Sequence, residues 1–470
     1  MIALPFTEAR IRILGLSTVV FLAFVGAAPS RQRAVVPPRQ IATLDLRRSF
    51  VITDAALLEG FTFQRVLDQL VARGGVSNLT SAQLYRQWFD TQNPKPGMAD
   101  PAGPHCDDFL TNGSPSFNSF PRRCPTPDGA LAASPFTSDE YFPIALVNRF
   151  DQTPADGSSC GQYRLIFARR IANPPQFIGP PFLQQRLHII FEPVLPNPKP
   201  STGLAGCRAV AEFWAGLTNI DSPTERRAKL ESFFFDGITG FPPAIDSGNF
   251  VGGGGIRTTQ VANGHVRMYQ FRLVKECTPA CTLQMRPDTL QNFPFGPLFD
   301  SSQDLPLTKA FQDAFVEQVP NLAVRDVNEY FMEIPPTFLM AESDPLDNQP
   351  VFLFDQPFTR GRAVNPGFND RIQEKLTSIG STLTPDQIIL RAETQNCVGC
   401  HAETGPVGEG VVFPRSVDTL QHVADNATEP GELGKPRFVI SSAMRDVFIP
   451  HRMKILIDFL NSGKAPPHSQ

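Results

Sequence analysis

Proline constrains this chain more than any other residue type. The sequence has 46 prolines among 470 residues, which is about twice the usual share. Proline fixes φ and has no backbone N–H, so this content limits long helices and favours loops, turns and short strands. With 41% hydrophobic and 19% charged residues, the chain can still build a packed core, which excludes global disorder. At about 150 residues per domain, the length predicts two or three domains.

The N-terminus predicts export. Arg10 and Arg12 precede an apolar run over 13–28 that ends in small residues, which is the pattern of a secretory signal peptide. Cleavage after Ala27 would remove residues 1–27 and leave a periplasmic or secreted protein. A buried N-terminal helix and an uncleaved membrane anchor are the alternatives. No later stretch reaches about 18 apolar residues, so we expect no integral membrane segment after cleavage.

Residues 28–375 predict a mixed α and β region of unknown function, which can divide into two subdomains. Apolar residues at helical spacing predict helices over 56–90. The segment 91–138 is rich in Pro, Gly, Asn and Ser and is expected to be irregular. Alternation of apolar and polar residues predicts strands at 163–167, 187–192 and 266–273.

The motif Cys397-Val398-Gly399-Cys400-His401 is C-x-x-C-H, the attachment signature of c-type haem. In this chemistry two thiols add across the two vinyl groups of haem, and the adjacent histidine supplies a nitrogen ligand to the iron. A random sequence with this cysteine and histidine content would contain about 0.002 such motifs. Two alternatives stay open: a redox disulfide, which usually accompanies a βαβ pattern, and half of a zinc site, for which the chain has no second C-x-x-C.

The motif lies between two predicted helices. Thr384 caps a helix that begins at Pro385 and runs toward the motif. Apolar residues at helical spacing predict a last helix over 450–460. With this helix order and the C-x-x-C-H motif, residues 380–470 resemble a class I cytochrome c domain. The resemblance implies a small all-α cytochrome c-like domain after an α+β, loop-rich N-terminal region, which itself resembles only uncharacterised secreted proteins.

The resemblance also implies the ligands of the cofactor, haem c with its iron. Cys397 and Cys400 would attach the haem, and His401 would be the proximal axial ligand. The distal axial ligand would be Met444 or His451. A methionine ligand raises the reduction potential and a histidine ligand lowers it. An open distal position would permit peroxidase-like chemistry.

Other residues are weaker candidates. Met453 is expected to be a core residue of the last helix, and His422 is a minor alternative as distal ligand. His188 and Glu192 share one side of a predicted strand and could hold a metal, although a satisfied polar pair is the preferred interpretation. Six cysteines outside the motif allow 15 pairings. The simplest pairs are Cys106–Cys124, Cys160–Cys207 and Cys277–Cys281.

The sequence favours an exported protein with one covalently bound haem that transfers single electrons. Its partner would be a redox protein or a small electron donor or acceptor. With 42 basic and 46 acidic residues, the charge gives no reason to expect nucleic acid as a partner. One alternative is an enzyme, a haem-dependent oxidoreductase with its substrate site in the N-terminal region. The other is a secreted binding or structural protein that haem only stabilises.

Overall fold

The computed structural model describes residues 43–170, 186–262, 265–303, 306–343, 366–395, 405–414 and 422–463. The predicted signal peptide and the C-x-x-C-H motif, with Cys397, Cys400 and His401, lie outside these residues. Residues 41–470 group into one compact unit.

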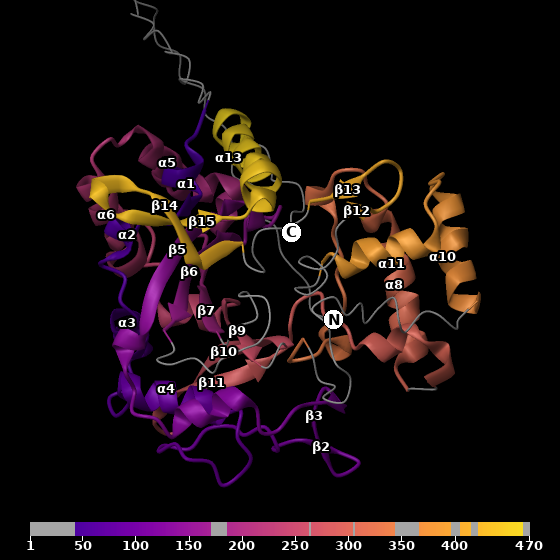
Figure 1. The fold of residues 1–470 in the computed structure, drawn as a ribbon, viewed down its shortest axis with the longest axis horizontal. Coiled ribbons are helices and arrows are strands. Elements are labelled where there is room, and N and C mark those ends of the chain that lie inside the picture. The colour runs from indigo at the N-terminus through magenta and orange to yellow at the C-terminus, as the bar shows by residue number, and fades with distance from the viewer. Residues whose placement is uncertain are drawn as a thin grey trace, which may run out of the picture. The chain divides into compact units, whose positions relative to one another are not determined.

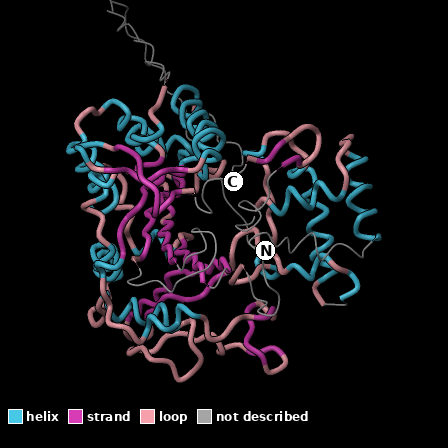
Figure 2. Tube along the Cα trace, in the orientation of Figure 1, coloured by secondary structure: helices cyan, strands magenta, loops and turns pink. Residues whose placement is uncertain are grey.

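An eight-stranded antiparallel sheet is the largest element of this unit (Figures 1 and 2). Its strands run in the order β1-β5-β6-β7-β9-β10-β11, and β8 pairs with β6 beside this path. The three strands predicted from alternation are confirmed as β6, β7 and β10. The strands are β1 Val51–Ile52, β5 Tyr141–Arg149, β6 Ser159–Arg169, β7 Arg186–Glu192, β8 Val194–Pro196, β9 Gly255–Ala262, β10 His265–Cys277 and β11 Cys281–Asp288.

One face of the sheet is apolar because alternate residues of each strand point to the same side. On this face, Phe167 of β6, Phe191 of β7 and Phe271 of β10 are at most 1% exposed. Helices supply their aromatic partners: the ring of Phe63 lies 5.2 Å from that of Phe167, and the ring of Trp88 lies 5.7 Å from that of Phe271. The opposite face carries the polar residues of the same strands.

Short helices surround the sheet, as the proline content predicts. The helices expected over 56–90 are confirmed as α2, α3 and α4. Among the described helices, none is long and apolar enough to cross a membrane. The bounds are α1 Leu46–Ser49, α2 Ala55–Leu58, α3 Phe63–Gly74, α4 Ser81–Asp90, α5 Arg208–Gly216, α6 Pro223–Glu231 and α7 Ser247–Val251.

Three further helices enclose a second hydrophobic cluster. They are α8 Thr308–Leu322, α10 Pro366–Ser378 and α11 Pro385–Glu393. Phe315, Ile372 and Ile388, one from each helix, are fully buried in this cluster. The boundary predicted between 28–375 and 380–470 falls at the connection from α10 to α11, and both helices contact α8.

The C-terminal region corrects one expectation: a small all-α cytochrome c-like domain is not present among the described residues. Two strand pairs lie between α11 and the last helix, α13 Ile449–Ser462. The prolines at 430 and 436, which flank the second turn, cannot lie inside a helix without losing a hydrogen bond. The pairs are β12 Gly405–Pro406 with β13 Val412–Phe413, and β14 Val423–Pro430 with β15 Pro436–Ile440.

The last helix packs against the N-terminal part of the chain. Leu456, Phe459 and Leu460 of α13 are buried in the same core as the sheet, and the ring of Phe459 lies 4.9 Å from that of Phe150. Helical spacing therefore identified the buried faces of α11 and α13 but not their partners, which belong to two different hydrophobic clusters.

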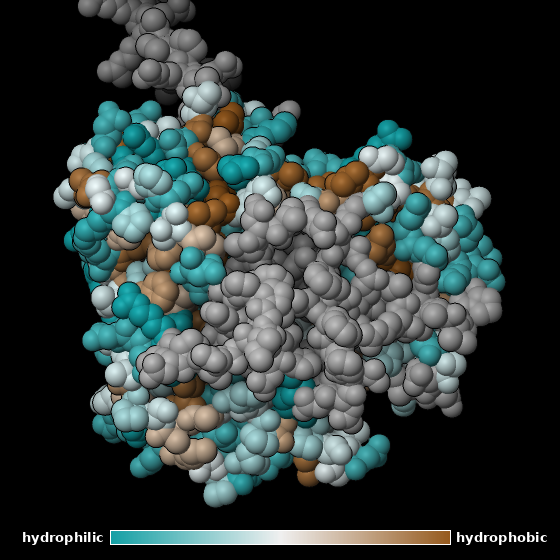
Figure 3. Space-filling model, in the orientation of Figure 1, coloured by the Kyte–Doolittle hydropathy of each residue, from teal (hydrophilic) through white to brown (hydrophobic). Residues whose placement is uncertain are grey.

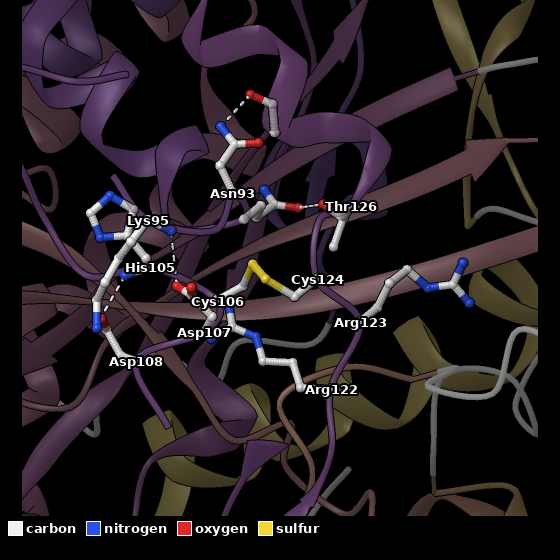
Figure 4. The surroundings of a disulfide bond; sticks show 12 residues. Asn93, Lys95, His105, Cys106, Asp107, Asp108, Arg122, Arg123, Cys124 and Thr126 are labelled. Atoms are coloured by element: carbon white, nitrogen blue, oxygen red, sulfur yellow. Dashed lines mark hydrogen bonds and ion pairs between the residues drawn. A yellow bond between two sulfur atoms is a disulfide. The ribbon is translucent and has the colours of Figure 1, made fainter. Parts of the chain in front are cut away.

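Three disulfides form between the nearest-neighbour cysteines: Cys106–Cys124, Cys160–Cys207 and Cys277–Cys281. The first holds the irregular segment 91–138, where Lys95, His105 and Asp108 lie on one side of it and Arg123 on the other (Figure 4). Paired cysteines are compatible with an exported protein.

The segment 91–138 also contains three short strands. The strands are β2 Leu110–Thr111, β3 Ser114–Phe117 and β4 Phe120–Pro121.

The Cys160–Cys207 disulfide is predicted to stabilise the fold more than the Cys277–Cys281 disulfide does. It links β6 to the start of α5 across 47 residues, and both cysteines are fully buried. Replacing both by serine should lower the free energy of unfolding by about 2–4 kcal/mol, measured by urea denaturation without reductant. The control is the same replacement of Cys277 and Cys281, which close a hairpin with a separation of only 4 residues and should matter less. Equal losses in the two variants would contradict this assignment.

Candidate functional site

Two segments flank the C-x-x-C-H motif. The structure describes the first up to Gln395 and the second from Gly405 onward. On the N-terminal flank, α11 begins as predicted. The Thr384 hydroxyl accepts a hydrogen bond from the backbone N–H of Gln387, and the Gln387 side chain accepts one from the backbone N–H of Thr384. Ile388, Ile389 and Ala392 bury the helix against the second cluster. The last described residues of this flank therefore lead directly into the motif.

Arg391 joins the two flanks of the motif. Its side chain is fully buried, and its Nε donates to the carbonyl oxygen of Val407 at 2.8 Å. One terminal nitrogen donates to the carbonyl oxygen of Gly408 at 3.2 Å. Val407 and Gly408 follow the motif, while Arg391 precedes it, so the described flanks on the two sides of the motif are held together at this arginine.

The other terminal nitrogen of Arg391 reaches a third segment. It donates to the carbonyl oxygens of Leu322, the last residue of α8, at 2.9 Å and of Val324 at 2.7 Å. Burial lowers the pKa of Arg391, and the nearby Tyr330 and Glu409 oppose that change. Four carbonyl acceptors satisfy the buried guanidinium, which is the condition for burying such a group.

Sequence reasoning did not identify Arg391. The available signal is its position: it lies three residues after Ile388 and next to Ala392, on the apolar stripe of a predicted amphipathic helix. A charged residue on such a stripe needs buried hydrogen-bond partners, and the sequence does not identify them.

The C-terminal flank leads to the distal-ligand candidates. Phe413 of β13 is buried, and its ring lies 6.3 Å from that of Phe448, the residue before α13. On the face shown in Figure 3, hydrophobic residues also reach the surface near β12 and β13, where Val412 is 64% exposed. The flanks of the motif and the start of α13 are thus connected through described contacts.

Met444 lies in a π-helical turn, Met444–Phe448, that continues into α13. It is 5% exposed and belongs to the main hydrophobic core, and its backbone N–H donates to the hydroxyl of Ser441. Met453 packs, partly buried, against the same core. Hydrophobic packing accounts for both methionines without a metal.

His451 differs from the methionines because part of its ring has no partner. It lies in the first turn of α13, and its side chain is 12% exposed. Its Nδ1 lies 3.6 Å from Oδ2 of Asp326. Its Nε2 is buried and, among the residues described, has no hydrogen-bond partner. Histidines that bind metals use one ring nitrogen for the metal and turn the other toward a carboxylate or carbonyl group, and His451 has this arrangement.

Asp326 connects His451 to the N-terminal flank of the motif. It lies two residues after Val324, whose carbonyl oxygen accepts the hydrogen bond from Arg391. One segment, 322–326, therefore contacts both the helix that leads into the motif and the histidine. This segment was not recognised from the sequence, because nothing local marks its contacts with Arg391, 67 and 69 positions away, or with His451, 125 positions after Asp326.

The remaining candidates have other partners. Nδ1 of His422 lies 3.2 Å from the hydroxyl of Ser441. His188 lies 3.1 Å from Asp425 of β14, whereas Glu192 contacts two arginines, so these two strand residues do not share a site. Within the described ranges, no group of three or more His, Cys, Asp and Glu side chains could hold a metal ion.

Arg391 can be tested by replacement with methionine, which keeps the length of the side chain and removes the donors. Four carbonyl groups then lose their partner, so Arg391→Met should lower the free energy of unfolding by about 3 kcal/mol or more. The control is Arg325→Ala in the same region. Arg325 is 80% exposed, and its loss should cost less than about 0.5 kcal/mol. Urea denaturation measures both, and similar losses would show that Arg391 does not hold these segments.

Comparisons with protein-family models, with curated proteins and with solved structures find no match for this chain. The function of the site is therefore argued from its own residues: the C-x-x-C-H motif, the Arg391 hydrogen bonds that hold its flanks, and His451.

Proposed function

We propose that the chain is an exported c-type haem protein with one covalently bound haem that transfers single electrons. The observation that carries the proposal is the C-x-x-C-H motif at 397–401. When bound, haem supplies a one-electron iron couple, and the protein sets its potential and its access to partners. Cys397 and Cys400 would form the two thioether bonds, each by addition of a thiol S–H across a vinyl C=C bond. His401 would be the proximal ligand.

Export supports the same proposal. Disulfides persist in oxidising compartments, and the described residues contain three of them, in a chain with a predicted signal peptide. We infer that the protein works in the periplasm or outside the cell. A redox protein or a small electron donor or acceptor would be its partner.

For the distal ligand we propose His451 over Met444. Two features support this choice: the buried Nε2 without a hydrogen-bond partner in the described structure, and the Asp326 carboxylate on the Nδ1 side. Asp326 would fix the tautomer with the proton on Nδ1, which leaves the Nε2 lone pair for the iron. Met444 would remain a core residue.

Covalent haem is tested first. The chain is produced with its signal peptide in a host with intact cytochrome c maturation machinery, and a denaturing gel is stained for haem. The wild-type band should stain, and the Cys397→Ala/Cys400→Ala double variant should not. A control double variant, Cys277→Ser/Cys281→Ser, should stain as the wild type does. Absence of stain on exported wild-type protein would refute the haem proposal.

The distal ligand is tested by optical spectra of both redox states. We expect low-spin, six-coordinate iron in the wild type and high-spin iron in His451→Ala. His451→Met should raise the reduction potential, because methionine favours the reduced iron more than histidine does. Met444→Leu should keep the wild-type spectrum. A high-spin spectrum for Met444→Leu beside an unchanged His451→Ala would instead identify Met444 as the ligand.

A further inference from the structure

Two arginines share one buried glutamate on the polar face of the sheet. Arg164 lies on β6, Glu192 on β7 and Arg257 on β9, which are neighbouring strands in that order. The Nε of Arg164 lies 3.0 Å from Oε1 of Glu192, and the Nε of Arg257 lies 2.9 Å from Oε2. The glutamate side chain is 1% exposed, whereas each arginine side chain is 19% exposed.

Two glutamines fix the arginines further. The Nε of Arg164 donates to Oε1 of Gln162, and the Nε of Arg257 donates to Oε1 of Gln270, both at 2.8 Å. The two Nε–H groups are therefore used. In the part of the chain that the structure describes, the terminal amino groups of Arg164 and Arg257 donate no hydrogen bond to the protein. The terminal N–H groups of these two guanidinium groups are thus left to donate hydrogen bonds to a bound acceptor.

The three charged groups do not balance. Two guanidinium groups face one carboxylate, which leaves a net positive charge at a largely buried place. Burial lowers the pKa of Arg164 to about 10; the carboxylates of Glu192 and Asp151 oppose this change, and the positive charges of Arg149 and Arg257 add to it. An additional anion would relieve this repulsion.

Glu192 provides a second, independent observation. Its Oε1 is buried and accepts no hydrogen bond from any residue that the structure describes, although the Arg164 Nε is close. This oxygen is ion-paired with Arg164 but keeps its capacity to accept a hydrogen bond, which a bound water or ligand would use. The cluster therefore offers donors for an anion and an acceptor for one donor group.

We propose that Arg164 and Arg257 form a binding site for a carboxylate group, with Glu192 Oε1 accepting a hydrogen bond from a neighbouring hydroxyl or ammonium group of the same molecule. Guanidinium groups bind carboxylates with paired N–H donors, so the chemistry of the two arginines fits this ligand. A small 2-hydroxy acid or amino acid carries both groups. The propionate side chains of haem are another source of carboxylate; they would bind the two arginines without a donor for Glu192 Oε1, and that source alone rests on the proposed function.

Lactate and propionate test the site as a matched pair, because they differ only by the hydroxyl group. Isothermal titration of the haem-free Cys397→Ala/Cys400→Ala chain should show lactate binding at least about tenfold more tightly than propionate. Arg257→Gln should weaken lactate binding by about tenfold or more. Arg272 is exposed and lies on β10, on the same face as Gln270. Arg272→Gln should therefore leave lactate binding unchanged. Circular dichroism verifies folding, and Arg257→Lys serves as a second variant that keeps the charge.

The haem-loaded protein distinguishes the two sources of carboxylate. Lactate binding with haem in place identifies a free acid as the ligand. Lactate binding only without haem, together with a changed haem spectrum in Arg257→Gln, identifies the haem propionates. Both results support a carboxylate site. No binding of either acid, with an unchanged haem spectrum in Arg257→Gln, would overturn the proposal, and loss of haem staining alone would refute only the haem proposal.

Discussion

The hydrogen bonds of Arg391 are the interaction on which the C-terminal part of the structure depends. A buried guanidinium group is costly unless its donors find acceptors, and here four main-chain carbonyl groups accept hydrogen bonds from its three nitrogens. These carbonyls lie in two segments, 322–324 and 407–408, that are far from each other in the sequence. Neither segment can move away without leaving a buried charge unpaired. The two described flanks of the C-x-x-C-H motif are consequently held together, and Asp326, which contacts His451, lies two residues after Val324 of the segment 322–324.

The two faces of the sheet carry different kinds of residue, aromatic on one and charged on the other. Its apolar face packs against aromatic rings from α3, α4 and α5, and this burial stabilises the sheet. Its polar face carries buried charges that a stable sheet does not need. One arginine would be sufficient to neutralise Glu192, yet Arg164 and Arg257 both contact it and Gln162 and Gln270 orient them. Because buried ion pairs add little to stability, this arrangement argues for binding.

Local patterns in the sequence predicted local structure well. Alternation identified β6, β7 and β10, the capping box identified the start of α11, and the nearest cysteines form the disulfides. The β14–β15 pair was missed because Val423–Pro430 has polar residues on both sides and so lacks a two-residue hydrophobic period. The contacts of Arg391 with Leu322, of Asp326 with His451 and of Arg257 with Glu192 join distant parts of the chain. Periodicity contains no information on such pairings, so the fold class of the C-terminal region and the arginine site required the structure.

The two proposals constrain each other. If His401 and His451 both bind the iron, no coordination position remains open for a substrate, and a bound carboxylate must act without touching the metal. The bound carboxylate would then act on the iron only through its negative charge. A negative group favours the oxidised iron, so occupation of the site would lower the reduction potential, and salt would weaken the effect where the path crosses solvent. Arg452, next to His451 in α13, lies 3.7 Å from Asp151, which pairs with the Arg149 that acts on Arg164. A chain of charged residues therefore leads from Arg164 and Arg257 to Arg452, the neighbour of His451. Under the two proposals, an acid bound at the arginines would be detected at the haem.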